Sequence, residues 1–206
     1  MHGNLFAGCL TTLGRGFVRV VTLLLVSSTM VANACAQTVE ERLAACGGCH
    51  GASGVSGMEN VPSLGGQPSD YVLIQLYLFR EKQRQIEVMN AMTQGLTDDD
   101  LRTLADTMSR LAPPPPAGEA PNAANRERAL DLVARYRCGS CHNADFSGHD
   151  QIPRLAGQRE DYLLKSLREY KSNARAGYDP AMNEVAQEVK ETDIPTLAHY
   201  LSGFRP

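Results

Sequence analysis

Cysteine is scarce in this 206-residue chain, which has only six. Two of them, Cys9 and Cys35, fall in an N-terminal segment with the character of a removable leader. The others all belong to two short motifs, so no thiol is left over for a structural disulfide. The chain also lacks the βαβ pattern that would carry a thioredoxin-like dithiol, and it has no convincing alternation of apolar and polar residues.

Excess positive charge and long apolar runs are missing as well. Lys and Arg number 6 against 10 Asp and Glu in residues 37–111, and 12 against 12 in residues 122–206. Neither half has the excess of Lys and Arg that a nucleic-acid-binding surface needs, so we expect no nucleic-acid partner. The uneven charge suggests a dipolar molecule that its partners could orient. The longest apolar run, Val20 to Val31, is shorter than the ~20 residues of a membrane span, so we expect at most peripheral membrane association.

The N-terminus predicts export. Arg15 and Arg19 precede the apolar run, and small residues follow it up to Ala36. This is the pattern of a signal peptide, here residues 1–36, cleaved after Ala36 or, alternatively, after Ala34. The predicted location is periplasmic, with an uncleaved anchor as the alternative.

Two C-x-x-C-H motifs carry the chemistry. Thiols about one helical turn apart can each bond one vinyl group of a porphyrin, and the adjacent imidazole can then bind the iron. Two weaker interpretations are a disulfide framework, which is possible in an exported protein, and a zinc site. The zinc site is disfavoured because the cysteine pairs lie far apart and neighbouring Cys and His cannot easily reach one metal. We therefore predict two covalently bound haem c groups. The attachment residues are Cys46, Cys49, Cys138 and Cys141, and the proximal iron ligands are His50 and His142.

The residues after the two motifs repeat. VPSLGGQPSDYVLIQL, from Val61, matches IPRLAGQREDYLLKSL, from Ile152. The run Pro113 to Pro116 lies between the two copies, and such a run acts as a semi-rigid spacer. The predicted division is an N-terminal domain at 37–111, a linker at 112–121 and a C-terminal domain at 122–206.

Each copy predicts the order helix, haem motif, Gly/Pro loop, helix, Met loop, helix, which makes the fold all-α. Thr38 with Glu41 forms a capping box ahead of the first motif. Thr97 and the three aspartates after it predict the acidic N-terminus of another helix. Further helices are expected at 69–80, 125–137 and 160–171, with a last one beginning at Thr192-Asp193.

A haem iron bound by one His still has a distal position to fill. Met182 is the only Met of the second half and the candidate there. In the first half Met89 and Met92 compete; Met89 is favoured because Met89 and Met182 each lie seven residues before an apolar position. His149 keeps a bis-His alternative open for the second haem. The carbonyls of Pro62 and Pro153 are placed to accept the Nδ1–H of the proximal imidazoles, unless these prolines simply form turns.

With its two C-x-x-C-H motifs, PxLxGQ loops and late Met residues, the chain resembles the dihaem cytochromes c of the c4 type over residues 38–206. The resemblance implies tandem class I cytochrome c domains related by pseudo-twofold symmetry. It also implies periplasmic electron transfer from a quinol-oxidising complex to a terminal oxidase. The first distal segment is two residues shorter than the second, which departs from a strict repeat.

Ligation by His and Met saturates an iron, so we expect a single-electron carrier in a respiratory chain and not an enzyme. One alternative is the electron-accepting subunit of a flavoprotein or quinoprotein dehydrogenase that oxidises, for example, sulfide or an alcohol. Another is a dihaem peroxidase, which would need an open or displaceable iron ligand.

Overall fold

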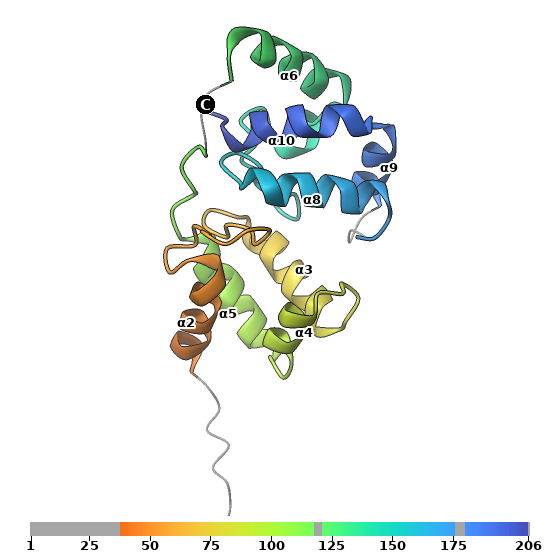
Figure 1. Ribbon diagram of the computed structural model, residues 1–206. Coiled ribbons are helices and arrows are strands. Elements are labelled where there is room, and N and C mark those ends of the chain that lie inside the picture. The colour runs from red at the N-terminus through yellow and green to blue at the C-terminus, as the bar shows by residue number, and fades with distance from the viewer. Residues whose placement is uncertain (1–37, 118–120, 176–179, 206) are drawn as a thin grey trace, which may run out of the picture. The chain divides into compact units, whose positions relative to one another are not determined.

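Every regular element of the described chain is helical. The computed structural model describes residues 38–117, 121–175 and 180–205 (Figure 1). Within these ranges the only β-type pairing is an isolated bridge between His149 and Ile152. The predicted all-α class is confirmed. The predicted signal peptide lies outside the described residues.

The two halves repeat one order of helices. The N-terminal half contains α2 (Val39–His50), α3 (Ser69–Arg80), α4 (Glu87–Thr93) and α5 (Asp98–Ser109). The C-terminal half contains α6 (Ala123–Arg135), α7 (Gly139–His142), α8 (Glu160–Lys171), α9 (Ala181–Glu188), the 3-10 turn η1 (Glu191–Asp193) and α10 (Ile194–Ser202).

Side-chain caps fix where several of these helices begin. Thr38 and Glu41 form a complete capping box at α2, and Thr97 and Asp100 form another at α5. Both boxes satisfy backbone N–H groups that no helical carbonyl can reach. Asn122 caps α6, which therefore starts two residues before the predicted position. The predicted helices over 69–80 and 160–171 are confirmed.

The segments that carry the late Met residues differ from the prediction. Met89 lies on α4 and Met182 lies on α9, so the prediction of loops there is wrong. Periodicity does not reveal α4, because it is only seven residues long. Side-chain hydrogen bonds, described below, anchor both segments to the rest of their halves.

Each half has an apolar core between its long helices. In the first half α3 packs against α5, around buried side chains that include Val72, Leu101 and Ala105. In the second half α8 and α6 pack against α10, around Leu132, Leu163, Ile194, Leu197 and Ala198. Cys46 and Cys138 pack against these cores, so each haem motif borders apolar side chains.

The proline run is packed against the rest of the chain, within a compact unit that spans Thr38–Pro206. Pro114 is buried, and the Ala117 N–H donates to the Ser202 carbonyl at 2.7 Å. A side chain on Gly66 would meet Pro113, and one on Gly157 would lie 2.5 Å from the Pro114 carbonyl oxygen. The equivalent glycine loops of the two halves therefore both lie against the linker.

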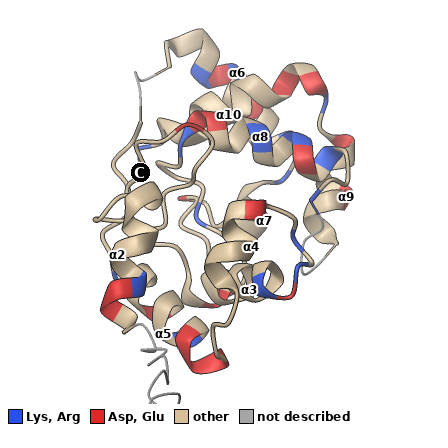
Figure 2. Cartoon of the chain, turned by 60° about the horizontal axis from the view of Figure 1, so that its bottom comes forward, with Lys and Arg blue, Asp and Glu red and all other residues tan. Residues whose placement is uncertain are grey.

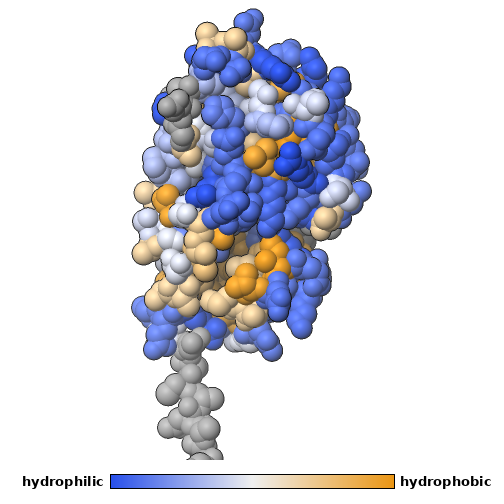
Figure 3. Space-filling view, viewed as in Figure 1, coloured by the Kyte–Doolittle hydropathy of each residue, from blue (hydrophilic) through white to orange (hydrophobic). Residues whose placement is uncertain are grey.

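Charge and apolar surface are distributed unequally. The first turns of α2 and α5 are acidic, whereas acidic and basic residues intermingle on α8 (Figure 2). Five of the six exposed large apolar side chains among the described residues belong to the N-terminal half, where Figure 3 shows apolar surface over the lower part of the view. In the described part of the chain, no helix combines the length and apolar character needed to cross a membrane.

The contact between the glycine loop and the linker predicts a stability difference. Gly157 and Gly95 have similar positive φ angles, +74° and +77°, but a side chain at Gly95 would meet nothing within 4 Å. We expect Gly95→Ala to lower the free energy of unfolding by about 1–2 kcal/mol, the cost of a left-handed residue. Gly157→Ala adds a clash with the Pro114 carbonyl, and we expect a loss of about 2–4 kcal/mol.

Denaturant unfolding of the haem-loaded protein measures both losses. Equal losses in the two variants would show that the linker does not lie against the Gly157 loop.

Candidate haem sites

The first C-x-x-C-H motif occupies the end of α2. Cys46 packs against the core, Cys49 is exposed, and His50 is 7% exposed. The His50 Nδ1 lies 2.8 Å from the Pro62 carbonyl oxygen. A carbonyl only accepts, so Nδ1 carries the proton and Nε2 is the nitrogen left to bind a metal.

The second motif repeats this arrangement. Cys138 precedes α7, and His142 is 8% exposed with its Nδ1 2.8 Å from the Pro153 carbonyl oxygen. The prediction that proline carbonyls accept from the two imidazoles is confirmed. Burial lowers the pKa of both His50 and His142 against the opposing effect of these hydrogen bonds. The neutral form that binds a metal is therefore favoured at each site.

The thiols are also placed for attachment to a porphyrin. All the motif cysteines are free, one of each pair half-buried and the other exposed. Among the described residues, no group of three or more His, Cys, Asp and Glu side chains could hold a metal ion, which argues against the zinc interpretation. The donor set that remains, two thiols and one oriented imidazole per motif, fits a covalently held haem.

The two Met segments are anchored in the same way. The Asn90 side chain donates to the carbonyls of Phe79 and Arg84, at 2.7 and 2.8 Å. The Asn183 side chain donates to the carbonyls of Tyr170 and Arg175, at 3.1 and 2.8 Å.

Met89 and Met182 each directly precede one of these asparagines, and both side chains are half-buried. The apolar residues seven positions later, Leu96 and Val189, are both buried. Met92 is 42% exposed and has no methionine at the matching position of α9. The anchoring therefore supports Met89 over Met92.

The other residues weighed as ligands have other surroundings. His149 lies in the loop after α7, with its Nδ1 3.1 Å from Asp150 Oδ2. His199 lies on α10, with its Nδ1 3.0 Å from Glu160 Oε2.

The two halves meet through reciprocal hydrogen bonds. The Gln67 amide donates to the Arg154 carbonyl and accepts from the Arg154 N–H, both at 3.0 Å. The Gln158 amide does the same with Ser63, at 2.9 and 2.8 Å. Gln67 and Gln158 are equivalent in the repeat, as are Ser63 and Arg154. Such exchange of equivalent partners is the signature of a twofold relation.

Two buried arginines lie at this junction. Arg84 is 9% exposed and Arg175 is 4% exposed. Their guanidiniums donate to neutral groups, including the phenol oxygens of Tyr71 and Tyr162 and the Gln75 amide. Among the described residues, no carboxylate lies within ion-pairing distance of either guanidinium.

A buried charge without an opposite charge is costly. Burial alone would raise the pKa of Tyr162, but Arg175 and Arg84 outweigh it and lower that pKa. Burial raises the pKa of the neighbouring Tyr71 to about 12, so that phenol stays neutral and does not compensate the positive charge. Haem carries carboxylate side chains, so these arginines are the residues that fit its propionates.

Sequence reasoning missed these arginines and the two anchoring asparagines. A signal existed for both. Arg84 and Arg175 stand at the same offset as the matched Gln67 and Gln158, and the dipeptide Met-Asn occurs in both halves.

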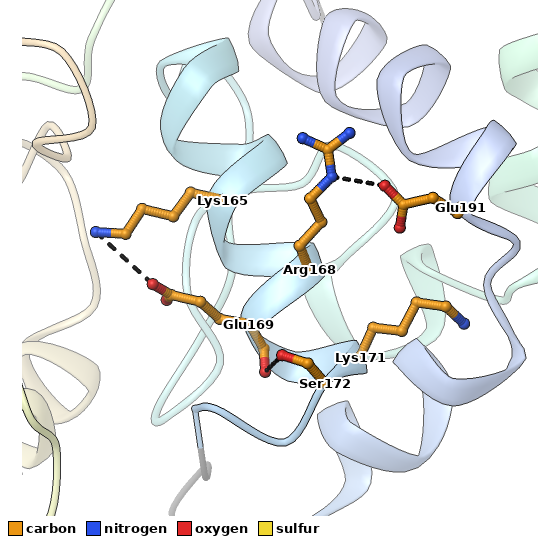
Figure 4. A pocket seen from close by; sticks show the side chains of 6 residues that line it. All are labelled: Lys165, Arg168, Glu169, Lys171, Ser172 and Glu191. Atoms are coloured by element: carbon orange, nitrogen blue, oxygen red, sulfur yellow. Dashed lines mark hydrogen bonds and ion pairs between the residues drawn. The ribbon is translucent and has the colours of Figure 1, made fainter.

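A separate hollow lies on the outer face of α8 (Figure 4). It is lined by Lys165, Arg168, Glu169, Lys171, Ser172 and Glu191. Arg168 pairs with Glu191 at 2.6 Å, and the Lys171 amine donates to backbone carbonyls of α9. None of the predicted haem residues lines this hollow.

Comparisons with known proteins agree with this arrangement. A family model described as cytochrome c matches residues 128–204. Cytochrome c4 of Thiocapsa roseopersicina is 31% identical over 174 residues, which cover 77% of this chain and 86% of that protein. The chain belongs to the cytochrome c4 family. It is an electron-transfer protein of tandem cytochrome c domains with two covalently bound haem c groups, and it is not an enzyme.

Two further relatives extend the comparison. The crystal structure of reduced cytochrome c4 from Pseudomonas stutzeri matches with a TM-score of 0.71 and 27% identity, over 82% of this chain and 100% of that chain. A protein of Thiomonas intermedia named thiosulfate dehydrogenase electron acceptor is 31% identical and covers 78% of each chain. The predicted family resemblance, fold class and cofactors are confirmed.

The asparagine anchors lead to a spectroscopic prediction. Asn90→Ala or Asn183→Ala leaves two backbone carbonyls without their donor, at a cost of about 1–3 kcal/mol. We expect the weak far-red Met–iron band of the ferric haem protein to diminish in each variant. Asn125→Ala, a change at an exposed asparagine of α6, is the control. A band unchanged in both anchor variants would show that these asparagines do not position the Met segments.

Proposed function

We propose that His50 with Met89 binds the first haem iron and that His142 with Met182 binds the second. The observation that carries this proposal is the repeated Met-Asn anchor, which gives each half one methionine in the same setting. Cys46 and Cys49 attach the first haem in this proposal, and Cys138 and Cys141 attach the second.

The protein's own residues then perform three tasks. The proline carbonyls orient the imidazoles and strengthen them as ligands. Met89 and Met182 would hold the distal side of each iron, which would leave no open position for a substrate. The buried arginines supply positive charge at the junction. When bound, each haem supplies a one-electron carrier, and a thioether ligand raises its reduction potential relative to a second imidazole.

The domains and the location belong to the same proposal. Residues 37–111 and 122–206 are the two haem domains, residues 112–121 are the linker, and residues 1–36 direct export to the periplasm. There the protein accepts electrons from a quinol-oxidising complex and passes them to a terminal oxidase of a respiratory chain.

A second candidate is the electron-accepting partner of a dehydrogenase. It is favoured by the 31% identity to the protein named thiosulfate dehydrogenase electron acceptor. Both candidates use the same iron ligands and differ only in the protein that supplies the electrons.

The ligand assignment predicts a pattern among three variants. Met89→Ala and Met182→Ala each abolish one haem's share of the far-red Met–iron band in the ferric protein, because each removes one sulfur ligand. Met92→Ala leaves the band intact and serves as the matched control from the same helix. Loss of the first haem's share in Met92→Ala, with retention in Met89→Ala, would reverse the assignment.

The carrier proposal predicts a free protein. On size exclusion of a native periplasmic extract, we expect the haem absorbance of this chain to elute at the size of the chain alone. Co-elution with a dehydrogenase subunit would favour the second candidate. Rapid peroxide turnover by the isolated protein would contradict both, because it needs an iron with an open or displaceable ligand.

A further inference from the structure

The junction arginines connect the two haem sites in a crossed pattern. The Arg84 carbonyl accepts from Asn90, beside Met89, while its guanidinium reaches the Tyr162 phenol of the other half at 3.4 Å. The Arg175 carbonyl accepts from Asn183, beside Met182. Each arginine is thus bound through its backbone to its own Met segment and through its side chain to the opposite half.

Arg175 makes the more extensive set of contacts. It donates to the Tyr71 phenol at 3.0 Å and to Gln75 at 3.3 Å, both on α3 of the first half. It also donates to Tyr162 at 3.3 Å and Ser166 at 3.2 Å, both on α8 of its own half. Arg84 donates only to Gln75 and Tyr162 among the described residues.

The Tyr71 end of this contact reaches the first haem site. Tyr71 packs in the same apolar cluster as Cys46, one of the proposed attachment residues. Arg175 thus contacts Tyr71 through its guanidinium and the Met182 segment through its backbone carbonyl, so this one residue links the surroundings of both sites. A buried positive charge disfavours the oxidised, more positive state of any nearby redox centre, and the low dielectric of the junction strengthens that effect.

We propose that Arg175 is a positioning residue shared by the two haem sites, which holds Tyr71 and Tyr162 at the junction and contributes positive charge to both haems, so that their reduction potentials are set together. This inference rests on the proposed His/Met ligation. It differs from an arrangement in which each half tunes its own haem independently.

The test is a potentiometric titration of the haem-loaded protein and its variants. In a Met182→His background, replacement of a thioether by an imidazole lowers the potential of the second haem and separates the two steps for assignment. In that background we expect Arg175→Gln to lower both midpoint potentials. Arg175→Lys keeps the charge but loses the fork of donors, and we expect it to restore much of the shift.

Arg135→Gln is the matched control, because it removes one positive charge from an exposed position of the same half. We expect neither potential to move in this variant, since solvent screens surface charge. A shift confined to the second haem in Arg175→Gln, or equal shifts in Arg175→Gln and Arg135→Gln, would overturn the proposal.

Tyr71→Phe tests the link between the two haem sites without removing the buried charge. Phenylalanine keeps the ring and loses only the hydroxyl, so this variant serves as the test if Arg175→Gln fails to load haem. Tyr71 belongs to the first half, but its hydroxyl contacts Arg175. We expect the potential of the second haem to shift in this variant. No shift of the second haem would overturn the proposal. If the two reduction steps stay unseparated in Met182→His, the ligand assignment fails. The titrations of Arg175→Gln in the protein that keeps Met182 then still decide whether Arg175 acts on both reduction steps.

Discussion

The hydrogen bond from each proximal imidazole to a proline carbonyl ties the covalent haem motif to one short loop. In the first half that loop continues from Pro62 to Ser63, which exchanges hydrogen bonds with Gln158 across the junction. It ends near Gly66, which lies against the linker. Imidazole orientation, the fit between the halves and the path of the linker are therefore set by the same few residues. A change in the backbone of this loop would therefore affect all of these features together.

Buried positive charge is the second constraint. Arg84 and Arg175 have only neutral protein partners among the described residues, and phenol or amide oxygens compensate a guanidinium poorly. Two buried guanidiniums without a carboxylate partner destabilise the fold, and the propionates of a bound haem would supply the missing negative charge. Folding of the junction and incorporation of haem are consequently linked, in the way that a metal site links binding to folding.

The features that the sequence predicts correctly depend on residues that lie close together along the chain. The capping box of Thr38 and Glu41 depends on residues three positions apart and forms as expected, and the helix expected after Thr97 begins at Asp98 with an acidic first turn. In each haem motif, the spacing of the two cysteines and the histidine sets how two thiols and one imidazole are placed relative to one another. The proline carbonyls follow from the short distance along the chain between motif and loop.

What the sequence did not reveal depends on contacts between distant residues. The α4 helix has no periodic pattern of its own and is held by Asn90, which donates to a carbonyl 11 positions away. The contact between Arg175 and Tyr71 spans 104 positions and exists only because the halves pack together. Asn90 and Arg175 could be found in the sequence as repeated residues, but their roles required the tertiary structure.

The reciprocal hydrogen bonds of Gln67 and Gln158 leave two equivalent side chains free to differ between the halves. Across the junction, each glutamine amide binds only backbone N–H and C=O groups, those of Arg154 and those of Ser63. The side chains at these two positions take no part in the pairing. A serine and an arginine can therefore occupy them without loss of the twofold hydrogen bonds, and the surfaces of the two domains can differ in charge while the pairing is kept.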